Sequence, residues 1–168
     1  MDPVTASIVI GRPREEVFDY LADIANHPEF TDHYLKRWHL TRIESSGRGA
    51  GARFRVDSPF NRFGWADVTF VQLERPYRIV GLGRAGKYNR NKTTEIWTLE
   101  PGPGEGSTEV TYLVETEPAL PTDRAFEALS FQRGWYKRNV RRALARLQEV
   151  LEDPEHARRG ERVTVGGL

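Results

Sequence analysis

The chain contains no cysteine, and this one absence excludes several kinds of site. There can be no disulfide, no thiol nucleophile and no cysteine-ligated metal. Long apolar runs are missing too: no stretch approaches the roughly 20 residues that a membrane span requires. The N-terminus has no basic run followed by an apolar segment, so we expect no signal peptide. With a net charge of only +1, we expect a soluble cytoplasmic protein that binds no nucleic acid.

Motifs for phosphate binding, acyl transfer and metal binding are also missing. The glycine-rich segment 47–51 joins two predicted strands instead of opening a helix, so it is no phosphate loop. No G-x-S-x-G elbow occurs. Imidazole suits zinc or iron, but His27, His33 and His39 follow one another at intervals of six residues, which matches no helical ligand pair. We expect neither a metal nor a cofactor.

The composition that remains is typical of one globular domain. The chain has 168 residues, 38% of them apolar and 29% charged. This length is enough for a substantial core. Residues 1–153 are predicted to form the domain. Residues 154–168 are charged and glycine-rich, and they are predicted to be a loosely held C-terminal tail.

The predicted order of elements is one strand, two short helices, six strands and one long helix. Apolar alternation and turn residues predict strands at 4–10, 38–44, 52–56, 65–74, 77–85, 92–99 and 108–116. The short helices are placed at 13–25 and 30–35, with a break at 26–28. Apolar residues at helical spacing predict the long helix at 122–153. The fold class is therefore α+β, with a curved antiparallel sheet of seven strands around a long C-terminal helix.

A cavity between this sheet and the long helix is expected, because a twisted sheet does not close perfectly against a helix. The first half of that helix has bulky residues around Gly134, among them Phe131 and Tyr136. A glycine inside a helix costs about 1 kcal/mol relative to alanine. We interpret Gly134 either as a close contact between helix and sheet or as room for a ligand.

Alternation within the strands indicates which side chains face this cavity. The predicted inward sets are Glu95, Trp97 and Leu99; Val80, Leu82 and Arg84; and Val110, Tyr112 and Val114. For the strand at 65–74 both faces remain open, one with Trp65 and the other with Val68 and Phe70.

The predicted ligand-binding residues are aromatic, and the candidates for acid–base catalysis are polar. The aromatic set is Trp65, Trp97, Tyr112, Phe126 and Trp135, and the catalytic candidates are Glu95, Arg84 and Tyr112. A buried charge needs a partner, so Arg84 and Glu95 are expected to meet each other or a ligand. A desolvated carboxylate there can act as a base. The alternative is that both charges lie solvated at the edge of the sheet.

Three segments resemble a known family. They are ASIVIGRPREEVFDYLADIANHPEF at the start, VTFVQLERPYRI in the centre and TEIWTLEPGPGEGSTEVTYLVE near the end of the sheet. They resemble the helix-grip fold of the START/Bet v 1-like (SRPBCC) superfamily, which includes polyketide cyclase/dehydrase-like proteins. The resemblance extends to about Asp153.

The resemblance implies a fold and a class of function without implying a catalytic residue set. It implies binding of a hydrophobic or aromatic small molecule, lipid-like or polyketide-like, between the sheet and the C-terminal helix. Two alternatives stay open: a polyketide aromatase/cyclase or dehydratase-like enzyme that uses acid–base residues of the pocket, and a protein-interaction domain without ligand. We expect a monomer or a homodimer.

Overall fold

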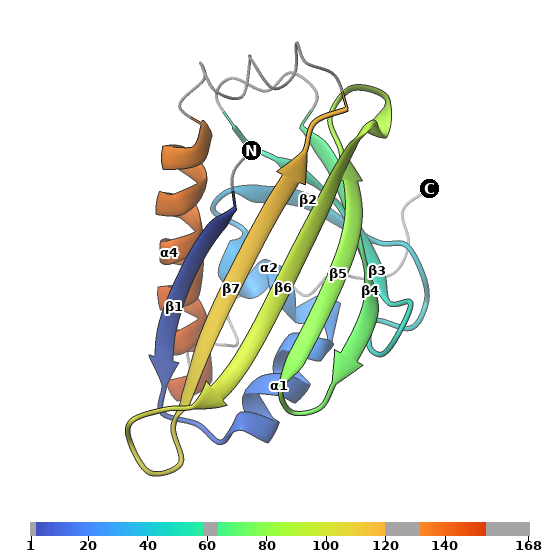
Figure 1. Ribbon diagram of the computed structural model, residues 1–168. Coiled ribbons are helices and arrows are strands. Elements are labelled where there is room, and N and C mark those ends of the chain that lie inside the picture. Colours follow the sequence, from blue (N-terminus) through green and yellow to red (C-terminus); the bar gives the residue numbers. More distant parts are fainter. Residues whose placement is uncertain (1–2, 59–63, 120–131, 154–168) are drawn as a thin grey trace.

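The computed structural model describes residues 3–58, 64–119 and 132–153 (Figure 1). Within them, seven strands form one antiparallel sheet in the order β1-β7-β6-β5-β4-β3-β2. The strands are β1 (Val4–Ile10), β2 (Leu35–Leu40), β3 (Gly51–Val56), β4 (Trp65–Glu74), β5 (Arg78–Ala85), β6 (Asn91–Pro101) and β7 (Thr108–Glu117). The predicted sheet is confirmed, although β2 begins and ends earlier than the predicted segment 38–44.

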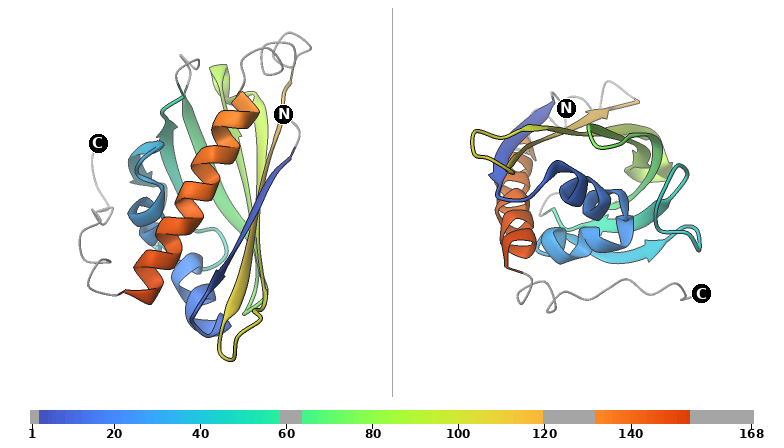
Figure 2. Two further views of the ribbon diagram at one scale, coloured as in Figure 1. Left: turned by 90° about the vertical axis from the view of Figure 1, so that its left-hand side faces the viewer. Right: turned by 90° about the horizontal axis from the view of Figure 1, so that it is seen from below.

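The sheet is a meander to which the first strand is added at the end. Strands β2 to β7 follow one another along the chain, and β1 returns to pair with β7, with Val4 opposite Val114 and Ile10 opposite Thr108. β1 and β2 are therefore the two edges. The sheet curls, and the helices lie on its concave side (Figure 2).

Two short helices follow β1, as predicted. Helix α1 (Arg14–Ala22) begins after Pro13, whose carbonyl accepts hydrogen bonds from the next turn. Glu15 and Glu16 lie in its first turn, where the helix dipole favours negative charge. Its apolar face is buried.

The second short helix begins earlier than predicted. Helix α2 covers His27–Thr31 and follows a 3₁₀ turn at Ile24–Asn26, so the predicted break at 26–28 is wrong. Pro28 lies in the first turn of α2, where a missing backbone N–H leaves no helical hydrogen bond unmade. Proline therefore opens a helix here instead of ending one.

Helix α4 (Gln132–Glu152) runs beside the edge strand β1 and against α2 (Figures 1 and 2). Its buried side chains, at helical spacing, are Val140, Ala143, Leu144 and Leu147. Its C-terminal part is tied to the end of β1 and the residues that follow. There Gln148 donates to the carbonyl of Val9, the backbone N–H of Gly11 donates to Glu152, and Arg12 donates to the carbonyl of Leu151. The start of the predicted helix, 122–131, and the tail, 154–168, lie outside the described residues.

The length of the C-terminal helix predicts that it alone covers the sheet, but it does not. Helices α1 and α2 also lie within the curl of the sheet (Figure 2). Phe18 of α1 and Phe30 of α2 belong to the same buried cluster as Phe70 of β4 and Leu144 of α4. The core thus has contributions from the sheet and from helices α1, α2 and α4.

Candidate functional site

The inner face of β6 and β7 carries the side chains on which the site is built. Trp97 lies directly opposite Tyr112 in the register of the two strands. Their ring centroids are 4.1 Å apart, and their planes are tilted by 32°. Trp97 is 3% exposed and Tyr112 is 9% exposed. The inward orientation predicted for both aromatics is therefore confirmed.

Glu95 shares this inner face, two residues before Trp97. The Tyr112 hydroxyl donates a 3.1 Å hydrogen bond to Glu95 Oε2. The other oxygen, Oε1, is buried without a hydrogen-bond partner among the described residues, and so is the indole Nε1 of Trp97. Burial raises the pKa of Glu95 to about 7, although the bond from Tyr112 acts in the opposite direction. The carboxyl group therefore titrates close to neutral pH.

A glycine on the neighbouring strand makes room for this carboxyl group. Gly81 of β5 is the register partner of Glu95. A Cβ atom placed on Gly81 would lie 2.7 Å from both Cγ and Oε1 of Glu95. Only glycine lets the Glu95 side chain lie across the adjacent strand in this way. The sequence analysis missed Gly81, because the contact depends on the pairing of β5 with β6.

Two further phenols approach Glu95 from the helical side. Tyr34 follows α2 and is buried, and Tyr136 lies in α4 and is half-buried. Burial raises the pKa of Tyr34, and Tyr136 and Glu95 raise it further. Burial likewise raises the pKa of Tyr112, with smaller contributions from Glu95, Tyr34 and Tyr136. Tyr34 and Tyr112 therefore stay protonated near neutral pH.

Helix α4 contributes an aromatic wall next to these phenols. The ring centroids of Trp135 and Tyr34 are 5.9 Å apart, and those of Trp135 and Tyr136 are 5.1 Å apart. Trp135 is thus in contact with Tyr34 and Tyr136, and its assignment as a ligand-binding residue stays a prediction. Tyr34 was missed, because nothing in its own segment shows that α4 will pack against it.

His27 lies deeper among aromatic rings. Its ring centroid is 5.8 Å from those of Phe70 and Trp97, and Nε2 donates a 2.9 Å hydrogen bond to the carbonyl of Leu21. Burial lowers the pKa of His27 to about 4, so the ring is neutral near pH 7. It acts as a buried structural side chain whose single donated bond connects α2 to α1.

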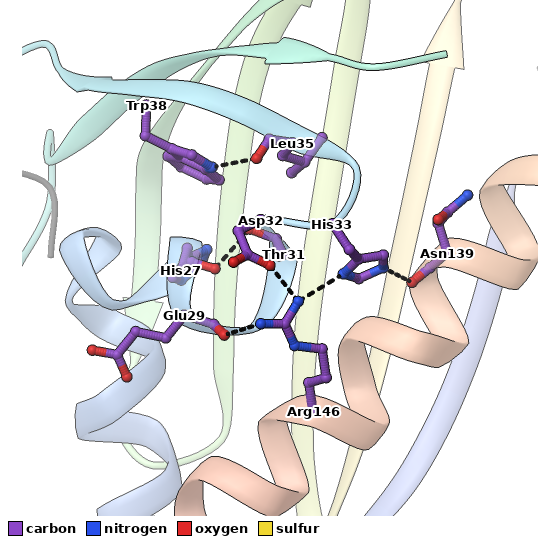
Figure 3. A network of polar contacts seen from close by, with 9 residues as sticks. All are labelled: His27, Glu29, Thr31, Asp32, His33, Leu35, Trp38, Asn139 and Arg146. Atoms are coloured by element: carbon purple, nitrogen blue, oxygen red, sulfur yellow. Dashed lines mark hydrogen bonds and ion pairs between the residues drawn. The ribbon is translucent and has the colours of Figure 1, made fainter. Parts of the chain in front are cut away.

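A polar network joins α2 and the residues that follow it to α4 (Figure 3). The Arg146 guanidinium is paired with Asp32, donates to Nδ1 of His33 at 3.3 Å and donates to the carbonyl of Glu29 at 3.0 Å. His33 Nε2 donates to the carbonyl of Asn139 at 3.2 Å. We call Asp32, His33, Asn139 and Arg146 the α2–α4 network. It holds α4 against α2 and so positions Trp135 over Tyr34.

His33 must be neutral to make both of these bonds. Its Nδ1 accepts from Arg146 while its Nε2 donates, which is possible only for the neutral ring. Burial lowers the pKa of His33, and the positive charges of Arg142 and Arg146 act in the same direction. His39, by contrast, lies exposed on β2. Within the described ranges, no group of three or more acidic, histidine or cysteine residues is arranged to hold a metal ion.

The prediction for β5 is wrong. Leu82 is 48% exposed and Arg84 is exposed as well, so both lie on the face opposite Glu95, and Arg84 and Glu95 do not meet. The sequence analysis predicts Val80 on the inward face together with Leu82 and Arg84. Ile79 and Val80 are both buried, and the register places Ile79 opposite Trp97. Two consecutive apolar residues left the alternation ambiguous.

The face of β4 that points inward is the one with Val68 and Phe70, and both side chains are buried. Trp65 therefore lies on the outer face, away from Trp97. There the Arg53 guanidinium lies 5.3 Å from its ring centroid, and the ring of His39 is 6.3 Å away. Trp65 does not belong to the cluster, contrary to its assignment as a ligand-binding residue.

Two further predictions concern the long helix. Phe126 lies outside the described residues, so its assignment as a ligand-binding residue stays a prediction. Gly134 is exposed, and no described residue would lie within 4 Å of a Cβ atom added to it. The close contact between helix and sheet is thus not found among the described residues.

The sequence matches a known family over most of its length. A family model described as polyketide cyclase / dehydrase and lipid transport matches residues 1–152. The sequence matches no curated protein. Within the described residues, no helix is long and apolar enough to cross a membrane.

Several solved structures share the fold. The solution structure of the KanY protein (ms6282) has a TM-score of 0.71 and 15% identity, covering 89% of this chain and 97% of that one. A crystal structure of TTHA0849 from Thermus thermophilus has a TM-score of 0.68 and 17% identity, covering 90% and 98%. Norcoclaurine synthase from Thalictrum flavum has a TM-score of 0.63 and 10% identity, covering 90% and 87%. At these identities the likeness concerns the fold alone.

Proposed function

The chain belongs to the polyketide cyclase/dehydrase and lipid transport family, and from this premise we propose that it binds a hydrophobic or aromatic small molecule, lipid-like or polyketide-like. The ligand would lie between the inner face of β6 and β7 and helix α4. Aromatic rings on both elements support this position: Trp97 and Tyr112 are stacked on the sheet, and Trp135 lies on the helix against Tyr34.

Three buried side-chain polar atoms lack a hydrogen-bond partner among the described residues: Arg14 Nε in α1, and two atoms of β6 that carry this proposal. Glu95 Oε1 and Trp97 Nε1 lie on the same face of β6, and neither has a hydrogen-bond partner among the described residues. Leaving such an atom unsatisfied costs about 1–3 kcal/mol. A bound ligand that supplies the missing partners offsets this cost.

Truncation of Trp135 should weaken the binding of a neutral apolar probe, N-phenyl-1-naphthylamine, by about tenfold, because one aromatic wall of the site is lost. The dissociation constant is measured by fluorescence titration, with circular dichroism as the check of folding. Trp65→Ala is the matched control, since Trp65 lies on the outer face. The proposed ligand position is wrong if Trp135→Ala binds the probe as tightly as the wild type. It is also wrong if Trp65→Ala loses as much probe affinity as Trp135→Ala.

A second candidate function is proton-transfer catalysis on a carbonyl substrate. The specific observation in its favour is the carboxyl group of Glu95, whose pKa of about 7 suits a base that works near neutral pH, beside the protonated phenols of Tyr112 and Tyr34. In this reaction Glu95 Oε1 takes the proton from the carbon next to a ketone. The C–H electron pair forms the enolate double bond, and a phenol donates a hydrogen bond to the enolate oxygen.

Deuterium exchange distinguishes this catalyst from a carrier. In heavy water, an enzyme of this kind should speed the loss of the α-protons of 2-tetralone, followed by proton NMR, and Glu95→Gln should slow the catalysed exchange at least about a hundredfold. Glu100→Gln, at an exposed position of the same strand, is the matched control. Exchange no faster than in buffer would leave binding as the function.

A further inference from the structure

We propose that the ligand of this site carries a neutral hydroxyl group on a flat unsaturated ring, a phenol or an enol, which donates a hydrogen bond to Glu95 Oε1 and accepts one from Trp97 Nε1–H. This inference rests on the proposed function and specifies the class of ligand. It starts from the two atoms of β6 that lack partners, because their chemistry determines what can satisfy them.

The two atoms have complementary needs. An ionised carboxylate oxygen only accepts hydrogen bonds, and an indole N–H only donates. A hydroxyl group is the smallest neutral group that can donate and accept at the same time. Where Glu95 is ionised, at pH values above about 7, an ether or a ketone would satisfy Trp97 and leave Glu95 Oε1 without a donor. An ammonium group would satisfy Glu95 and leave Trp97 without an acceptor.

The charge around the site argues against an anionic ligand. Among the residues that the structure describes, the titratable side chains acting on this region are the phenols of Tyr34, Tyr112 and Tyr136. Burial raises the pKa of Tyr34 and of Tyr112, so both are neutral donors, and the neutral ring of His27 lies beyond Trp97. None of the lysines and arginines that the structure describes is buried. Arg146, the cation of the α2–α4 network, is already bound to Asp32 and to backbone. A ligand carboxylate would thus meet Glu95 without a compensating cation.

The aromatic side chains near the two atoms favour a ring over an acyl chain as the ligand. Trp97 and Tyr112 are tilted by only 32° and present neighbouring ring surfaces, and Trp135 contributes another ring from α4. Offset stacking and edge-to-face contacts favour aromatic partners by about 0.5–1.5 kcal/mol beyond their buried area. A flat ring with a hydroxyl at one end would therefore stack on these rings and satisfy the two unpartnered atoms.

Three naphthalene probes of nearly equal size test this inference by isothermal titration calorimetry at pH 8, where Glu95 is ionised. They are 2-naphthol, 2-methoxynaphthalene, which lacks the donor, and 2-naphthoate, which is an anion. We expect 2-naphthol to bind about tenfold more tightly than 2-methoxynaphthalene, because one hydrogen bond to a charged group is gained. We expect 2-naphthoate to bind most weakly.

A pair of variants connects that preference to the carboxyl group. Glu95→Met should reduce the preference for 2-naphthol to within about twofold, because the acceptor is gone. Glu100→Met, on the exposed face of the same strand, should keep it. Equal binding of 2-naphthol and 2-methoxynaphthalene to the wild type, tightest binding of 2-naphthoate, or a preference that survives Glu95→Met overturns the inference and leaves the proposed function standing. Binding of none of the three probes overturns the proposed function itself.

Discussion

Replacement of Glu95 by glutamine is expected to increase the free energy of unfolding by about 2 kcal/mol at pH 8.5 and to have almost no effect at pH 4.5. Burial raises the pKa of this carboxyl group from 4.5 to about 7. A shift of this size corresponds to about 3 kcal/mol. We expect less than this, because the residue as a whole is only half-buried and solvent screens part of the effect.

The sign follows from proton linkage. Between pH 4.5 and 7 the folded protein keeps a proton on Glu95 that the unfolded chain has already released. Stability therefore falls as pH rises through this window, and above pH 7 the full cost of the buried carboxylate is present. Glutamine carries no charge, so the benefit of the substitution grows over the same window.

Urea unfolding at the two pH values measures this effect, with Glu100→Gln as the matched control at an exposed position. If Glu95→Gln destabilises the protein equally at both values, the carboxyl group is not held in a desolvated site. A gain in stability would have a further meaning. If the protein with glutamine at position 95 is more stable than the wild type, the carboxylate is kept at a cost in stability. Such a cost is typical of functional positions, because perturbed ionisable groups concentrate there.

His27 is expected to have the opposite pH dependence, with an effect of about 3 kcal/mol. Burial lowers the pKa of its ring from 6.5 to about 4. As pH falls from 6.5 to 4, His27 binds a proton in the unfolded chain but not in the folded protein, so the free energy of unfolding decreases over this window. The size follows from 1.36 kcal/mol per pH unit, and no discount for exposure applies, since the side chain is buried.

The effects of His27 and Glu95 cancel between pH 4.5 and 6.5 in the wild type, because one destabilises on acidification while the other stabilises. The measurement is therefore made in the Glu95→Gln background. There, urea unfolding should show a loss of about 3 kcal/mol between pH 7 and pH 4. Adding His27→Gln, whose amide can still donate to the Leu21 carbonyl, should remove most of that loss.

The control for this comparison is His39→Gln in the same background, since His39 is exposed on β2. It should leave the pH dependence unchanged. His33 adds a smaller slope of the same sign as His27, because its pKa is also lowered. If the double variant Glu95→Gln/His27→Gln loses as much stability on acidification as Glu95→Gln alone, His27 does not carry the effect.

Part of the candidate site could be predicted by alternation alone. Glu95, Trp97 and Leu99 were assigned to one inward face because two large apolar residues at a spacing of two leave only one consistent orientation for the strand. The same reasoning placed Tyr112 correctly on β7. It failed on β5, where Ile79 and Val80 are consecutive apolar residues and both are buried.

The order of the elements, the antiparallel sheet and the face of β6 that carries Glu95 can be predicted from local periodicity and turn residues. Three features emerge only when the chain is folded: the room that Gly81 makes for the carboxyl group, the contact between Tyr34 and Trp135, and the outer position of Trp65. These contacts join segments far apart in the chain, and they depend on strand register and on the packing of α4 against α2, which no local pattern encodes.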